Sequence, residues 1–255
     1  MTHDIEAFYD DRTSTLTYVV SDPETRDTVV IDPVLDYDPK ASKTWTESVD
    51  EVTAYIREND FNLRYVLETH AHADHLSGAQ FLKKRFPNAR LAIGERITEV
   101  QSLFKEVFDL PEDFPTDGRQ FDELFGEGDT IEAGSLTFEV IETPGHTPAD
   151  ATYKIGDAIF TGDALFMPDM GTGRCDFPGG SAEDMYHSVH GKLYELPDDT
   201  EVYVGHDYQP GSREVAYCAT IGEHKANNVK LDADTTEEEF VEARQQRDEQ
   251  LEAPQ

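Results

Sequence analysis

Apolar residues recur along the first half of this chain with the two spacings that distinguish strands from helices. Short runs rich in Val, Leu, Ile, Thr and Tyr predict strands at 16–20, 28–31, 63–67 and 90–93. Residues 47–59 instead place Val49, Val52 and Ile56 three and four positions apart, which predicts an amphipathic helix. Further helices are predicted at 76–86 and 95–108, and a polar loop at 34–46.

The second half repeats this order after a Pro-, Gly- and Asp-rich stretch that is predicted as loop, 109–129. Strands are predicted at 136–141, 151–155, 158–161 and 201–204, and helices at 182–193, 213–227 and 236–251. The order strands, helices, strands, helices predicts one α/β (layered α+β) domain over residues 1–255, with two mixed sheets sandwiched between helices. Its core is expected at about 5–230, followed by the charged helix at 236–251.

Acidic residues outnumber basic ones by 54 to 21, which gives a formal net charge of −33. The acidic residues are spread along the whole chain, as on a surface adapted to high salt, where screening reduces self-repulsion. We therefore expect a halophilic source. The same charge argues against partners that are nucleic acids or anionic membranes, because both require basic patches.

The two cysteines, Cys175 and Cys218, form neither a disulfide framework nor a CxxC metal pair. The N-terminus has no basic segment followed by an apolar one, and no apolar run approaches membrane-spanning length. We expect a soluble, cytoplasmic protein.

Residues 69–75, Thr-His-Ala-His-Ala-Asp-His, follow directly after an apolar run and contain three of the nine histidines. His70 and His72 are two positions apart, so in an extended segment their imidazoles point to the same side. Asp74 and His75 then approach the same space from another direction. Imidazole nitrogens with carboxylate oxygens suit Zn, Fe or Mn better than Ca or Mg. The motif therefore predicts a metal site at the carboxyl end of a strand.

Three more polar residues follow predicted strands in the same way. His146 lies on a Pro-Gly turn, Asp163 follows Gly162, and His206 follows Gly205. Each is a weak candidate alone, and their shared position at strand ends makes all three candidate ligands. The remaining histidines are expected to be structural: His3, His187, His190 and His224.

The ordered set H-x-H-x-D-H, His146, Asp163 and His206 resembles the metallo-β-lactamase superfamily over residues of about 15–210. That family has an αββα sandwich with its metal site at one edge, between the sheets. Additional segments resemble the persulfide dioxygenase branch and its bacterial β-lactamase-hydrolase-like relatives, namely residues 30–34, 68–70, 161–165, 173–177 and 206–208.

This resemblance implies oxidation of a thiol persulfide by O2 to sulfite, with release of the thiol. It implies one Fe(II) per chain held by His70, His146 and Asp163, a facial triad with open positions for sulfur and O2. Around this iron would lie the residues of a former second metal site: His72, Asp74, His75 and His206. Two of them, Asp74 and His75, are candidates for a catalytic role. The resemblance also suggests a homodimer.

Arg174 is the candidate for binding an anionic group of the substrate, because guanidinium binds carboxylates in a bidentate manner. The alternative is a structural salt bridge with Asp176 or Asp169. Cys175 is expected to be a packed residue rather than a sulfur carrier.

Two other functions fit the sequence. One is a dinuclear zinc hydrolase of thioesters, similar to glyoxalase II, which would use all seven ligands with Asp163 bridging the metals. Only 49 residues follow His206, fewer than the long helical region typical of glyoxalase II. The other is a sulfur-binding or redox-sensing protein that keeps the metal without turnover, which the complete ligand set argues against.

Overall fold

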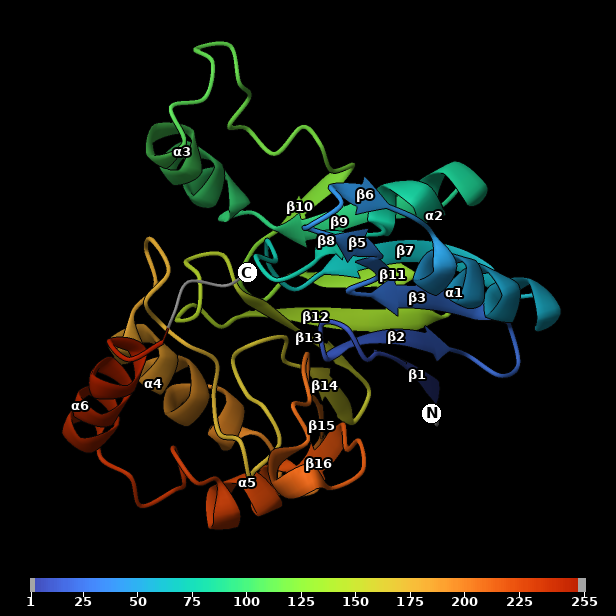
Figure 1. Cartoon of the computed structure of the whole chain (residues 1–255). Coiled ribbons are helices and arrows are strands. Elements are labelled where there is room, and N and C mark those ends of the chain that lie inside the picture. Colours follow the sequence, from blue (N-terminus) through green and yellow to red (C-terminus); the bar gives the residue numbers. More distant parts are fainter. Residues whose placement is uncertain (1–2, 252–255) are drawn as a thin grey trace.

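The computed structural model describes residues 3–251, and two six-stranded mixed sheets form its centre (Figure 1). The first sheet has the order β1 (Asp4–Asp10), β2 (Thr15–Ser21), β3 (Asp27–Ile31), β7 (Asn62–Glu68), β9 (Arg90–Gly94) and β10 (Glu123–Phe125). The second has the order β11 (Thr130–Ala133), β12 (Leu136–Glu142), β13 (Ala151–Ile155), β14 (Ala158–Phe160), β15 (Glu201–Tyr203) and β16 (Cys218–Thr220).

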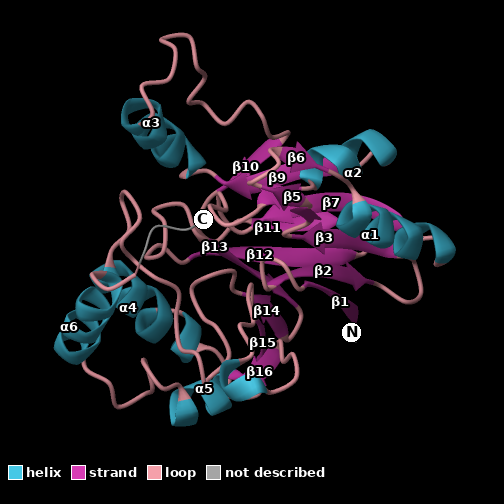
Figure 2. Ribbon diagram, in the orientation of Figure 1, coloured by secondary structure: helices cyan, strands magenta, loops and turns pink. Residues whose placement is uncertain are grey.

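Helices cover the outer faces of both sheets (Figure 2). The first sheet is covered by α1 (Glu47–Glu58) and α2 (Ala79–Arg85), and α3 (Ile97–Val107) projects from its edge. The second sheet is flanked by α4 (Ala182–Gly191), α5 (Ile221–Asn227) and α6 (Glu237–Asp248). The predicted sandwich of two mixed sheets between helices is confirmed.

Alternation along the strands of the first sheet divides the apolar residues between two cores. Val19, Val30 and Val66 pack against the α1 and α2 side, together with Val52 and Ile56. Their neighbours along the strands pack between the sheets, against side chains of the second sheet: Tyr18, Val20, Ile31, Tyr65 and Leu67. Within residues 3–251 no helix has the length and apolar character needed to cross a membrane.

Several predicted boundaries were wrong. The helix predicted at 76–86 begins only at Ala79, because Leu76–Ser77 (β8) pairs with Val34–Leu35 (β4) in a region predicted as loop. Residues 37–38 and 43–44 also pair there as short strands β5 and β6. The stretch 109–129 contains β10, which continues the first sheet beside β9.

The helix predicted at 213–227 was also wrong over its first half. Residues 218–220 form β16, which pairs with β15, and α5 begins after Thr220. Thr220 and Glu223 form a capping box, which fixes this start. The predicted charged helix at 236–251 is observed as α6 over Glu237–Asp248, also with a capping box at Thr236. It buries one face, formed by Phe240, Arg244 and Asp248.

Candidate metal centre

Parallel pairing of β3 with β7 brings Asp32 beside the histidine motif. The backbone N–H and the hydroxyl of Thr69 each donate to the Asp32 carboxylate, both at 2.7 Å. The same hydroxyl lies 3.0 Å from Nδ1 of His70 and can accept its proton. His70 therefore keeps its Nε2 lone pair free, and burial lowers the pKa of His70 well below its ordinary value.

His72 is clamped by two buried carboxylates. Its Nε2 lies 3.2 Å from Oδ1 of Asp32 and 3.2 Å from Oε2 of Glu68, and Glu68 also accepts a hydrogen bond from Ser77. Burial lowers the pKa of His72, but the two carboxylates outweigh burial and hold this pKa well above its ordinary value. The clamp leaves Nδ1 of His72 as the free ring nitrogen.

His146 and His75 are oriented by backbone carbonyl groups. Nδ1 of His146 donates to the carbonyl of Arg174 at 2.7 Å, and Nδ1 of His75 donates to the carbonyl of Leu76 at 3.1 Å. In each ring this assigns the proton to Nδ1 and leaves Nε2 free. Burial, with the neighbouring His72, lowers the pKa of His75 to about 3, so that ring is neutral at ordinary pH.

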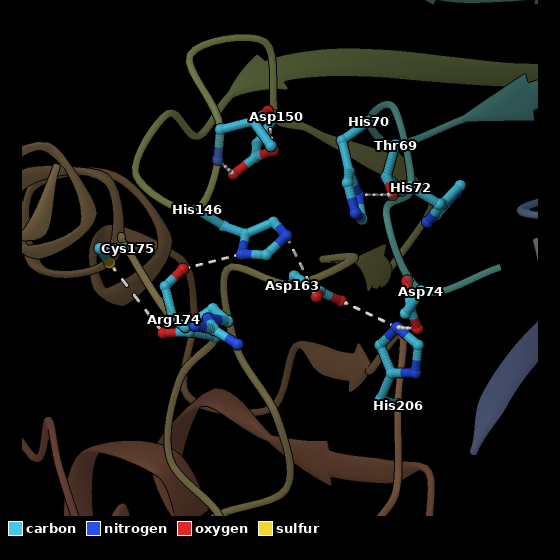
Figure 3. A network of polar contacts seen from close by, with 12 residues as sticks. Thr69, His70, His72, Asp74, His146, Asp150, Asp163, Arg174, Cys175 and His206 are labelled. Atoms are coloured by element: carbon cyan, nitrogen blue, oxygen red, sulfur yellow. Dashed lines mark hydrogen bonds and ion pairs between the residues drawn. The ribbon is translucent and has the colours of Figure 1, made fainter. Parts of the chain in front are cut away.

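Asp163 lies between His146 and His206 and is close to both, as Figure 3 shows. Its Oδ2 lies 3.5 Å from Nε2 of His146, and its Oδ1 lies 3.4 Å from Nε2 of His206. Nε2 of His206 is also 3.3 Å from Oδ2 of Asp74. The turn that carries Asp163 packs against the histidine motif at Gly162, which has a φ of +50° and where a side chain would collide with the Thr69 hydroxyl.

The potential ligand atoms form three groups, each with its atoms within 4.8 Å of one another. The groups are His70, His146 and Asp163; His72, Asp74 and His75; and Asp32, Glu68 and His72.

Five buried ligand atoms have no hydrogen-bond partner within residues 3–251: Nε2 of His70, Nδ1 of His72, Oδ2 of Asp74, Nε2 of His75 and Oδ1 of Asp163. Buried polar atoms without partners are costly. His70 and Asp163 belong to the first of these groups, and His72, Asp74 and His75 to the second. A metal ion bound by either group would give the free atoms of that group partners, so the residues fit one or two such ions.

A cavity of about 470 Å³ opens beside this cluster and is lined by Asp74, His146, Asp163 and Arg174. Arg174 also forms two 2.6 Å bonds to the carboxylate of Asp176, which is one of the two salt bridges predicted as alternatives. The other predicted partner, Asp169, pairs with Arg213 instead.

Cys175 is buried, and burial raises the pKa of its thiol. The thiolate form that sulfur transfer requires is therefore disfavoured, which agrees with the packing role predicted for this cysteine.

The roles of Asp32 and Glu68 were not predicted from the sequence. Each is the polar residue at the end of a buried strand, the same signal that pointed to His146 and His206. What distinguishes these two carboxylates is that they hold His72 by hydrogen bonds, and this depends on the pairing of β3 with β7.

The Metallo-beta-lactamase superfamily profile matches residues 10–206. The chain belongs to this superfamily. The crystal structure of ETHE1 from Myxococcus xanthus is similar, with a TM-score of 0.78 and 31% identity over 100% of this chain and 93% of that chain. Membership of this superfamily and the clustered histidines and aspartates make the protein a metal-dependent enzyme.

Three curated relatives differ in name. Glyoxylase B2 of Dictyostelium discoideum is 45% identical over 98% of this chain and 86% of its own length. A Beta-lactamase hydrolase-like protein of Agrobacterium fabrum is 46% identical over 98% of this chain, which spans only 57% of that relative. Persulfide dioxygenase ETHE1 of Mus musculus is 32% identical over 93% of this chain and 78% of its own length.

Proposed function

We propose that this chain is an iron-dependent persulfide dioxygenase acting on the persulfide of a low-molecular-weight thiol. The overall reaction is RSSH + O2 + H2O → RSH + SO3²⁻ + 2H⁺, in which the outer sulfur is oxidised and O2 is reduced. The observation that carries the proposal is the buried group of His70, His146 and Asp163, of which His146 and Asp163 line a cavity. Two histidines and one carboxylate with open positions are typical of non-heme Fe(II) oxygenases.

When bound, Fe(II) supplies the positions at which the sulfur and O2 meet. The side chains of the protein prepare this place. Thr69 and the carbonyl of Arg174 hold His70 and His146 with their Nε2 atoms free. Burial raises the pKa of Asp74, but His206, His75 and His72 outweigh burial and lower it, so Asp74 is an ionised carboxylate at the cavity wall that can accept a proton.

A dinuclear zinc thioester hydrolase is the second candidate, favoured by one feature of the site. Asp163 places one oxygen towards His146 and the other towards His206, as a carboxylate bridging two metals would. His72, Asp74 and His75 form a second group of potential ligands. The similarity to Glyoxylase B2 supports this candidate as well.

Metal content and oxygen uptake separate the two candidates. Protein purified under reducing conditions without added metal is expected to contain about one iron per chain and to consume O2 with a thiol persulfide, yielding sulfite. For the proposed dioxygenase, the variant His206→Ala is expected to retain its iron. For a dinuclear hydrolase, the same substitution would remove one of the two metals. About two zinc ions per chain, thioester cleavage and no O2 uptake would overturn the proposal.

A further inference from the structure

Several basic side chains line the cavity beside the candidate metal centre. Lys230, Arg244 and Arg247 line it, together with Arg174. These are four of only 21 basic residues in a chain with a net charge of −33. The acidic residues of the cavity wall, Asp74 and Asp163, belong to the metal cluster.

Lys230 is held in place by the backbone that follows α5. Its N–H donates to Oδ1 of Asn228 at 3.1 Å, and its stem packs so closely over Gly171 that a Cβ there would lie 2.6 Å from Lys230 Cγ. Burial and the nearby Arg244 and Arg247 lower the pKa of Lys230 to about 8. Its ammonium group has no hydrogen bond or ion pair with any residue between 3 and 251.

The two arginines come from α6. Arg244 is only 4% exposed, its Nη1 donates to the carbonyl of Gly173 at 3.3 Å, and its Nη2 pairs with Asp248. Its Nε is buried without a hydrogen-bond partner in the described part of the chain. Arg247, one turn of helix further on, pairs with no acidic side chain of residues 3–251. Within residues 3–251, Asp248 is thus the only carboxylate that forms an ion pair with any of these three cations.

Cations that lie close together in a partly buried pocket repel one another and lose hydration, even where a carboxylate pairs with one of them. An anionic ligand relieves both costs, and guanidinium groups bind carboxylates and phosphates with directional, charge-assisted hydrogen bonds. The cavity volume of about 470 Å³ lies in the range of sites for small molecules.

We propose that Lys230, Arg244 and Arg247 bind an oxyanion, a carboxylate or a phosphate, on the thiol that carries the persulfide sulfur. The sulfur then reaches the end of the cavity formed by His146 and Asp163. This inference rests on the proposed function for the identity of the substrate. It attributes a preference for anionic over neutral persulfides to residues of the C-terminal helical region.

Three persulfides test the charge preference by O2 uptake: those of glutathione, with two carboxylates, of coenzyme A, with phosphates, and of uncharged 2-mercaptoethanol. We expect kcat/KM for one anionic persulfide to exceed that for the neutral one by at least about tenfold. Lys230→Met and Arg247→Met are each expected to reduce this ratio about tenfold, through KM. The matched control is Lys225→Met, since Lys225 on α5 pairs with Asp198 at the surface.

The preferred anionic persulfide distinguishes carboxylate from phosphate. A wild-type enzyme that turns over all three persulfides equally, or variants that leave the ratio unchanged, would overturn the oxyanion site. Two variants are used because loss of one cation could disturb folding, and far-UV circular dichroism with thermal melting identifies such a case.

Equilibrium binding keeps this test separate from the proposed reaction. Isothermal titration calorimetry of the metal-loaded protein with glutathione, coenzyme A or 2-mercaptoethanol requires no turnover. The oxyanion site is supported if one anionic thiol binds more tightly than 2-mercaptoethanol and if Lys230→Met weakens this binding about tenfold. This conclusion holds even if no persulfide causes O2 uptake. Equal and weak binding of all three thiols overturns the site even if O2 uptake is observed.

Discussion

The imidazole of His146 is oriented by the backbone of Arg174, 28 residues later, through a 2.7 Å hydrogen bond from Nδ1 to the carbonyl oxygen. The segment around Arg174 is held in turn by α6. Asp248 accepts a hydrogen bond from the N–H of Cys175 at 2.9 Å, and Arg244 donates to the carbonyl of Gly173. A candidate metal ligand is thereby linked to the last helix of the described chain.

Asp248→Ala is predicted to weaken both the fold and metal binding. The substitution leaves Arg244 and the N–H of Cys175 buried without this partner, which should lower the free energy of unfolding by about 3 kcal/mol. Metal affinity should fall roughly tenfold or more, because the orientation of His146 is less fixed. Urea unfolding and chelator competition measure the two effects. Glu249→Ala, next to it and exposed, is the control, and equal effects of both variants would contradict the link.

Asp32→Asn is predicted to reduce metal affinity by about 10- to 100-fold while preserving the fold. The amide cannot accept from both donors of Thr69 and also hold the Nε2 proton of His72, so the rings of His70 and His72 lose their fixed orientation. Chelator competition measures the affinity. Asp32 and Asp60 both adopt a positive φ, and Asp60 is exposed, so Asp60→Asn is the matched control. Unchanged affinity in Asp32→Asn would show that Asp32 does not position the ligands.

Metal removal is predicted to destabilise the protein. A metal present at 100 times its dissociation constant stabilises the native state by about 2.7 kcal/mol, which for a chain of this size corresponds to roughly 5–10 °C in Tm. Differential scanning calorimetry with and without a chelator measures the shift. Asp163→Ala, which removes one candidate ligand from the group of His70, His146 and Asp163, should melt at the same temperature in both conditions. If the chelator lowered the Tm of Asp163→Ala as much as that of the wild type, the metal would be bound at another place.

His224 is predicted to make stability depend on pH between about 4 and 6.5. Burial lowers the pKa of His224 to about 4, against 6.5 in the unfolded chain. As pH falls through this interval the unfolded state takes up the proton first, so stability decreases by up to about 3 kcal/mol. Urea unfolding at pH 7.5 and 4.5 should show a smaller decrease in His224→Gln than in the wild type. His187→Gln, at the exposed His187 on α4, should behave as the wild type; equal behaviour of all three proteins would refute the assignment.

Local sequence patterns were sufficient to predict the sandwich and to locate the candidate ligands. The strands are apolar and short, and each candidate ligand lies beyond the end of one strand, so their meeting at one edge of the sandwich, between the two sheets, follows from topology. The start of α5 could not be predicted in this way. Residues 213–220 have a composition compatible with helix, and only pairing of β16 with β15 decides their conformation.

The residues that hold the candidate ligands in place were harder to predict than the candidate ligands themselves. Glu68 and Asp32 become partners of His72 only through the parallel contact of β3 with β7. The basic lining of the cavity combines Arg174 with residues of the C-terminal region, more than 50 positions away in sequence. Such contacts depend on how α6 packs on the loop at Gly173 and Cys175, which no periodicity along the chain specifies.

The contrast between an acidic chain and a cationic cavity has a consequence for the rate at which substrate arrives. An anionic molecule is repelled by the net charge of −33 at long range and attracted by the four basic side chains only at short range. The Debye length falls from about 10 Å at 0.1 M salt to about 3 Å at 1 M. Salt therefore removes the repulsion first, while the partly enclosed contacts are screened less. Encounter with an anionic substrate should accelerate as salt rises, the reverse of ordinary electrostatic steering.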